Sequence, residues 1–244
     1  NHTDDDYSVI GGGVNHHIWV GNTNANYNVI AGGTNNGIIG NSCTVGGGQH
    51  NHISQELAAG VIGSTIAGGY TNSLIGNYCT ISGGYLNTIP VNCGDYNTIT
   101  GGYSNTTVAA STNNGGNVLG GYDNSIQGQY CVINGGLTNA ITLAAGAIGS
   151  TIAGGRSVTI TGDYSTVSGG RLISVTGDYS TISGGYTNSL TGNYCVISGG
   201  YLNTIPVNCG DYNTITGGNS NTTVAASTNN GGNVLGGYDN SIQG

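Results

Sequence analysis

Aliphatic residues recur along the chain at a fixed distance from pairs of glycines. An Ile or Val stands two positions before a Gly-Gly pair fourteen times, so this position is always β-branched. Successive pairs are fifteen positions apart six times, as from Gly154 to Gly169, and eighteen to twenty-one positions apart otherwise. A second aliphatic column lies six positions after the first glycine of most pairs. The pattern predicts a basic coil of fifteen positions with two short strands, lengthened in places by short loops.

This periodicity determines the expected fold class. The aliphatic residues of both strands can point inward, and glycine permits the tight corners between the strands. Such a coil cannot bury its apolar face alone and needs a neighbouring coil on each side. We therefore expect an all-β fold, a β-solenoid of about fourteen coils that forms a single repeat domain over residues 1–244.

The array also contains a long internal duplication. Residues 70–128 and 186–244 match at 56 of 59 positions. Residues 58–69 and 144–155 are nearly identical as well, but their offset is shorter by two basic coils, the regular stretch around Arg156 and Arg171. The array has therefore grown by whole coils. Both ends interrupt a coil, which fits a fragment of a longer array or ends that stack on other subunits.

Tyrosine is confined to two further columns. Nine of the sixteen Tyr lie five positions before a Gly pair, and seven lie two positions after its first glycine. Counting alternation from the inward Ile places the first column outward. A stacked row of exposed Tyr suits lateral packing or carbohydrate contact, or it stabilises neighbouring coils. The residues predicted to make lateral contacts are Tyr78, Tyr130, Tyr164, Tyr179 and Tyr194.

Charge is scarce and mostly acidic. Only 5% of the residues are charged, the net charge is −8, and Arg156 and Arg171 are the only Lys or Arg residues. Nucleic-acid binding and attraction to anionic lipid both require clustered cations, so neither partner is expected. No apolar run approaches the roughly 20 residues of a membrane span.

No motif indicates catalysis, a cofactor or a metal. The chain lacks a Ser-His-Asp, Walker-type or zinc motif, and its glycine pairs follow the coil period rather than a phosphate loop. The histidines near the N-terminus are interpreted as a solvated polar patch. Asp163 and Asp178 share one column in adjacent coils, and that column and a second one rich in Asn are interpreted as turn positions. We therefore expect no enzyme activity.

Six cysteines in an Asn- and Gly-rich chain suggest disulfides. Cys79 and Cys93 are separated by nearly one basic coil, and Cys195 and Cys209 repeat that spacing in the duplicate. This predicts two loop staples, Cys79–Cys93 and Cys195–Cys209. Two more cysteines have no partner one coil later, and they either bridge subunits or are buried small residues in a column that elsewhere holds Ser; these are Cys43 and Cys131.

Three sequons for N-linked glycosylation are present. They begin at Asn1, Asn105 and Asn221. The last two precede a long segment that we expect to form a protruding loop.

The repeats resemble a known family. The runs over residues 177–188 (Gly-Asp-Tyr-Ser-Thr-Ile-Ser-Gly-Gly-Tyr-Thr-Asn) and 63–72 (Gly-Ser-Thr-Ile-Ala-Gly-Gly-Tyr-Thr-Asn) are similar to the head repeats of YadA-like trimeric autotransporter adhesins. The resemblance implies a β-roll of short, regular coils on a bacterial surface. The chain departs from that family in its cysteines, in its long coils and in showing neither a coiled-coil stalk nor a membrane anchor.

Together these features predict a structural protein of the cell surface or extracellular space. The expected function is that of a subunit in a sheath, surface layer or filament, built by stacking of solenoid edges and by lateral contacts and reinforced by disulfides. The expected partner is the protein itself, as a homo-oligomer or polymer. The alternative is an adhesin head that binds a host, matrix or glycan ligand through exposed Tyr and Asn.

Overall fold

The computed structural model describes residues 1–4, 7–19, 27–54, 61–108, 115–142, 147–207, 209–224 and 231–242. Within these ranges every strand is two residues long and there is no helix, hence none of a length and apolarity suited to crossing a membrane. The chain divides into two compact units, Asn1–Gln127 and Gly128–Gly244. Each is a parallel β-solenoid, and together they contain about 13 turns of about 16 residues, which confirms the predicted fold class. A single domain over 1–244 stays a prediction.

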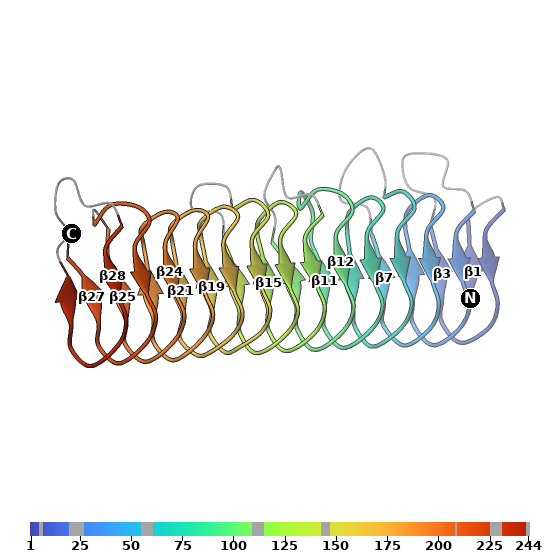
Figure 1. Cartoon of the computed structure of the whole chain (residues 1–244). Coiled ribbons are helices and arrows are strands. Elements are labelled where there is room, and N and C mark those ends of the chain that lie inside the picture. The colour runs from blue at the N-terminus through green and yellow to red at the C-terminus, as the bar shows by residue number, and fades with distance from the viewer. Residues whose placement is uncertain are drawn as a thin grey trace. The chain divides into compact units, whose positions relative to one another are not determined.

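Each coil of the first unit contributes one strand to each of two parallel sheets (Figure 1). The odd-numbered strands form the first sheet: β1 (His2–Thr3), β3 (His17–Ile18), β5 (Gly37–Ile38), β7 (His52–Ile53), β9 (Ser73–Leu74), β11 (Thr88–Ile89), β13 (Thr106–Thr107) and β15 (Ser125–Ile126). The even-numbered strands form the second: β2 (Val9–Ile10), β4 (Val29–Ile30), β6 (Thr44–Val45), β8 (Thr65–Ile66), β10 (Thr80–Ile81), β12 (Thr98–Ile99) and β14 (Asn117–Val118).

The second unit repeats this arrangement. Its odd-numbered strands are β17 (Ala140–Ile141), β19 (Thr159–Ile160), β21 (Ser174–Val175), β23 (Ser189–Leu190), β25 (Thr204–Ile205), β27 (Thr222–Thr223) and β29 (Ser241–Ile242). Its even-numbered strands are β16 (Val132–Ile133), β18 (Thr151–Ile152), β20 (Thr166–Val167), β22 (Thr181–Ile182), β24 (Val196–Ile197), β26 (Thr214–Ile215) and β28 (Asn233–Val234).

The core consists of the aliphatic columns that the sequence pattern predicts. Strands pair in register, so Ile81 lies between Ile66 and Ile99 in neighbouring coils. The second residue of nearly every strand points inward and is fully buried, while the first is partly exposed. Burying one such side chain contributes about 1.5 to 3 kcal/mol, so the stacked Ile and Val supply the main stabilisation of both units.

Two turns connect the strands of a coil, and both are used below. The Gly-Gly turn leads from an even-numbered strand to the next odd-numbered one, as residues 153–158 do between β18 and β19. The opposite turn leads back to an even-numbered strand, as residues 161–165 do between β19 and β20. Each turn therefore recurs once per coil.

The second glycine of the Gly-Gly pair is required by the close approach of the next coil. At Gly69 the backbone is left-handed, with φ of +92°, and a Cβ would collide with the carbonyl oxygen of Gly84. At Gly68, the first glycine of the same pair, φ lies outside the left-handed region and a Cβ would meet no atom within 4 Å. The two members of the pair therefore have different roles.

This difference yields a matched pair of substitutions. Gly69→Ala should lower the free energy of unfolding by about 2 to 4 kcal/mol, because the left-handed backbone and the overlap with Gly84 both oppose a side chain. Gly68→Ala should leave it unchanged or raise it by up to about 1 kcal/mol. Urea unfolding followed by circular dichroism measures both, and equal effects would contradict the assignment.

Candidate functional site

The outer surface of the opposite turn carries a row of stacked tyrosines. In the second unit Tyr164, Tyr179, Tyr194 and Tyr212 follow one another, with ring centroids 5.1, 5.0 and 5.1 Å apart and interplanar angles of 15° or less. In the first unit Tyr7 stacks on Tyr27 and Tyr78 on Tyr96. We call these rows the opposite-turn ladders.

The five tyrosines predicted to make lateral contacts all lie on this surface. Their exposed fractions range from 44% at Tyr194 to 65% at Tyr130, so the outward orientation is confirmed. Their backbones are left-handed, with φ between 49° and 53°. Their contact with another molecule stays a prediction.

Stacking determines which part of each ring remains available. A ring inside the row has both faces against its neighbours, so it presents its edge and its hydroxyl to solvent. Partial desolvation, and after it the neighbouring Tyr194 and Tyr164 and the carboxylates of Asp163 and Asp178, raise the pKa of Tyr179. The Tyr179 hydroxyl therefore stays protonated over the neutral range.

Acidic and amide side chains cap the opposite turns beside the ladder. Asp163 Oδ1 accepts a hydrogen bond from the Ile148 N–H, and Asp178 Oδ1 accepts one from the Asp163 N–H, both at 2.8 Å. Asn193 Oδ1 accepts the next from the Asp178 N–H, also at 2.8 Å. This column is therefore a turn cap, as the sequence pattern suggested.

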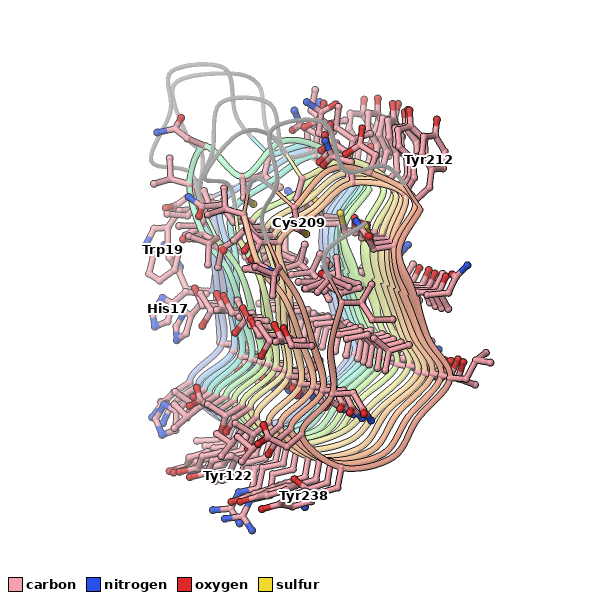
Figure 2. The ribbon with its side chains drawn as sticks, turned by 60° about the vertical axis from the view of Figure 1, so that its left-hand side comes forward. His17, Trp19, Tyr122, Cys209, Tyr212 and Tyr238 are labelled. Carbon is pink, nitrogen blue, oxygen red and sulfur yellow. The ribbon has the colours of Figure 1, made fainter. Side chains whose placement is uncertain are left out.

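The Gly-Gly turn carries a second set of stacked tyrosines. In the first unit the rings of Tyr70, Tyr85, Tyr103 and Tyr122 stack at centroid distances of 5.2, 5.0 and 4.8 Å. In the second unit Tyr186 stacks on Tyr201 at 5.3 Å. Tyr238 of this column and Tyr212 of the opposite-turn ladder lie at opposite ends of the coil cross-section (Figure 2).

A buried column of asparagines lies beneath the Gly-Gly turns. Asn203 is typical: its N–H donates to Asn188 Oδ1 at 2.9 Å, and its side-chain amide donates to the carbonyls of Gly199 and Gly218. Its own Oδ1 accepts from the N–H of Asn221 in the next coil. These asparagines form an internal hydrogen-bonded ladder from coil to coil, and they are not available as an exposed Asn surface.

This ladder corrects the glycosylation prediction. Asn105 and Asn221 are fully buried, and the Nδ2 of each donates to two glycine carbonyls. The amide nitrogen that a glycan would modify therefore has no access from solvent in the folded chain. Asn1 is exposed, and its side chain bonds the His16 N–H and the Gly13 carbonyl.

The disulfide predictions are wrong for this structure. All six cysteines are free and buried. Cys79 and Cys195 belong to a second inner ladder, beneath the opposite turns, in which each side chain accepts a hydrogen bond from the next coil: Cys79 Sγ from the Asn97 N–H, and Cys195 Sγ from the Asn213 N–H, both at 3.3 Å. Ser fills the same role elsewhere; for example, Ser64 Oγ accepts from the Cys79 N–H at 3.0 Å.

Their predicted partners lie in the opposite turns of the next coils, Cys93 between β11 and β12 and Cys209 between β25 and β26. Cys93 and Cys209 are fully buried, and each backbone carbonyl accepts from the side-chain amide of an asparagine, Asn97 or Asn213. Figure 2 shows the Cys209 side chain on the inner side of the ribbon. The spacing places the two cysteines of each predicted pair in successive coils, but no bond joins them.

Cys43 and Cys131 also occupy the inner ladder. Both are fully buried, which confirms the small-residue interpretation and removes them as bridges between subunits. Burial raises the pKa of the Cys43 and Cys131 thiols and raises that of Cys79 to about 12. These thiols are therefore protonated and unreactive at neutral pH.

The histidines near the N-terminus differ in their surroundings. Among the described residues no group of three or more His, Cys, Asp or Glu could hold a metal ion. His16 is buried and takes the place of an asparagine in the ladder, where its Nδ1 accepts from the Asn36 N–H at 3.2 Å. His17 stacks on Trp19 on the outer face at 4.9 Å (Figure 2). The solvated-patch interpretation therefore fails for His16.

Comparison with known proteins identifies no family. No family model matches the chain, and no curated protein matches its sequence. The resemblance to adhesin head repeats is supported at the level of the parallel β-solenoid fold alone.

The asparagine ladder can be tested with a matched pair. Asn203→Asp should lower the free energy of unfolding by about 2 to 4 kcal/mol, because a buried carboxylate would face the carbonyls of Gly199 and Gly218 without a donor. Asn193→Asp should lower it by no more than about 1 kcal/mol, because the exposed carboxylate keeps the capping oxygen and only adds a like-charge contact with Asp178. Urea unfolding of both variants tests this, and equal losses would overturn the assignment.

The thiols give a chemical test. At about pH 8 a thiol reagent should modify none of the six cysteines of the native protein at an appreciable rate, because all six are buried. Raised pKa values also suppress the thiolate of Cys43, Cys79, Cys93, Cys131 and Cys195. Reaction should begin at higher pH than for a free cysteine. After unfolding in denaturant without reductant, all six should react, whereas a smaller number would show that disulfides exist.

Proposed function

We propose that this protein is a structural subunit of an extracellular assembly, such as a sheath, surface layer or filament. It would assemble by stacking of coil edges and by lateral contact between tyrosine rows. Its role is mechanical rather than catalytic, and its partner is another copy of itself.

The opposite-turn ladders carry this proposal. Exposed aromatic side chains in a continuous row form an amphipathic strip, apolar along the ring edges and polar at the hydroxyls. Tyr is enriched at protein interfaces because it combines a large apolar area with a hydrogen-bonding group. A strip with the periodicity of the coil is complementary to another strip of the same periodicity.

The same geometry gives less support to a glycan-binding adhesin. Flat carbohydrate contact uses the open face of an aromatic ring, but Tyr179 has Tyr164 on one side and Tyr194 on the other. The asparagines that could have bonded sugar hydroxyls are buried in the ladder beneath the Gly-Gly turns. Both features that suggested a glycan surface in the sequence are therefore used within the coil stack.

The inner ladders suit a load-bearing subunit. Within each unit, backbone bonds, the asparagine ladder and the Ser/Cys ladder all run from one coil to the next, along the stacking direction. Pulling two coils apart would therefore have to break all of these hydrogen bonds at once.

An extracellular location is proposed on composition, since only Arg156 and Arg171 offer cleavage sites to trypsin-like proteases.

The test is the size of native particles formed by the full chain without any ligand. Electron microscopy and sedimentation should show sheets or fibres, and reductant should leave them unchanged because the cysteines are unpaired. Replacing Tyr164, Tyr179 and Tyr194 together by Asn, which tolerates left-handed backbone, should weaken lateral association about tenfold or more.

A matched variant keeps the test specific. Replacing Tyr85 and Tyr103 by Asn removes stacked rings from the Gly-Gly turns of the first unit, where the duplicate already has Asn219 at the position of Tyr103. This variant should retain lateral association if the opposite-turn ladder forms the contact. Discrete short particles from the unmodified protein at all concentrations would contradict the proposed function.

A further inference from the structure

The two coils over residues 156–185 are an insert in the duplicated array. The segment before them, 144–155, matches 58–69, and the segment after them, 186–244, matches 70–128, but nothing corresponds to these two coils in the first copy. The insert is itself a tandem pair, because residues 156–170 and 171–185 are identical at ten of fifteen positions. Two whole coils of one type have therefore been added at one place.

The insert contains both cations of the chain, at its Gly-Gly turns. Arg156 and Arg171 pair directly in adjacent coils, and both are exposed. The guanidinium of Arg171 lies over the ring of Tyr186, with 5.3 Å between Cζ and the ring centroid. This cation–π contact holds one guanidinium at the surface of the turn.

The insert also contains two carboxylates in adjacent coils, at its opposite turns. Asp163 and Asp178 each use Oδ1 to cap a backbone N–H, which fixes the position of the carboxylate. No residue in the described part of the chain donates a hydrogen bond to Oδ2 of either. Each carboxylate is half-buried and held in a fixed orientation, and its Oδ2 is able to accept further hydrogen bonds.

Among the described residues, neither the two arginines nor the two aspartates have an oppositely charged partner. The only ion pair among the described residues joins His2 and Asp4, so neither arginine has a carboxylate partner there. Like charges directly opposite one another on adjacent strands are destabilising. The insert thus holds a pair of cations at one turn and a pair of anions at the other, and neither pair forms an ion pair with another described residue.

We propose that residues 156–185 are a lateral docking site for a second copy of this chain, in which Arg156 and Arg171 of one copy pair with Asp163 and Asp178 of the next. The inference rests on the proposed function, since it names the contact through which copies associate side by side. Arg and carboxylate groups form bidentate hydrogen-bonded pairs. Two such pairs would offset the repulsion between the arginines and the repulsion between the aspartates.

The coil repeat makes the two charge pairs match. Both the arginines and the aspartates are one coil apart, so their separations are set by the same strand spacing, about 4.8 Å. The chain has no Lys or Arg besides these two arginines, so no other pair of adjacent coils can present two such cations. The contact therefore has one register in which both pairs form.

The placement of the charges also determines the type of assembly. The cations and the anions lie at the two different turns of a coil, and the columns of those turns, marked by Tyr238 and Tyr212, lie at opposite ends of the cross-section (Figure 2). A contact between two different surfaces of identical subunits is heterologous, and without a closing rotation it continues indefinitely. Side-by-side copies would therefore form an open sheet rather than a closed dimer.

The experiment is a charge exchange on the full chain. One variant carries Arg156→Asp and Arg171→Asp, and the other carries Asp163→Arg and Asp178→Arg. Each alone should associate about tenfold or more weakly than the unmodified protein, and an equimolar mixture should recover association between unlike variants. Lateral association of the unmodified protein should weaken between about 20 mM and about 500 mM NaCl, because salt screens exposed charges.

Two further variants keep the test decisive. Asp163→Asn with Asp178→Asn retains the capping acceptor, as Asn193 shows, and should still lose association if the charge matters. Arg156→Lys with Arg171→Lys keeps the charge but loses the bidentate geometry, so it should weaken association less than the charge reversal does. Electron microscopy and sedimentation velocity provide the readout.

The outcomes separate the two proposals. Sheets that persist unchanged in the Asn variant and in both charge-reversed variants would refute the docking site and leave the structural function standing. An unmodified protein that stays in discrete particles at every salt concentration would refute both.

Discussion

Parallel stacking in register places almost every residue beside the residue of the same column in the next coil, and the rest of the structure depends on this constraint. A side chain is acceptable only if it is compatible with a near-copy of itself about 4.8 Å away. Ile and Val meet this condition by packing, Tyr by ring stacking, and Asn by donating from one end of its side chain and accepting at the other. The composition of the chain follows from this requirement.

The constraint explains why charge is so rare. A charged column would stack like charges, which is unfavourable, so only 5% of the residues are charged. Caps at the opposite turns are Asn or Asp, since one oxygen suffices to accept the backbone N–H. Arg156 and Arg171 depart from the rule, as does the pairing of Asp163 with Asp178. These like-charge pairs are informative, because the stability of the coil stack does not explain why they are present.

Buried polar groups follow the same logic. A polar atom inside a solenoid needs a partner supplied by the next coil, so it persists only as a ladder. The asparagine ladder is interrupted at Val158 and Ile173, in the two inserted coils, where an apolar side chain needs no partner. In the second inner ladder a thiol, a hydroxyl or an amide serves equally as the acceptor, which is why Cys, Ser and Asn share one column.

The all-β solenoid, the inward aliphatic columns and the outward tyrosines of the opposite turn were predictable from the sequence, because a strict repeat translates position in the sequence directly into position in the coil. The buried Asn column was also accessible from sequence, since Asn36 lies two positions before the inward Ile38 and so shares its side. The state of the cysteines, the burial of Asn105 and the stacked orientation of the rings became known only from the folded structure. These depend on distances and directions between coils, and spacing along one chain does not specify the direction in which a side chain leaves a turn.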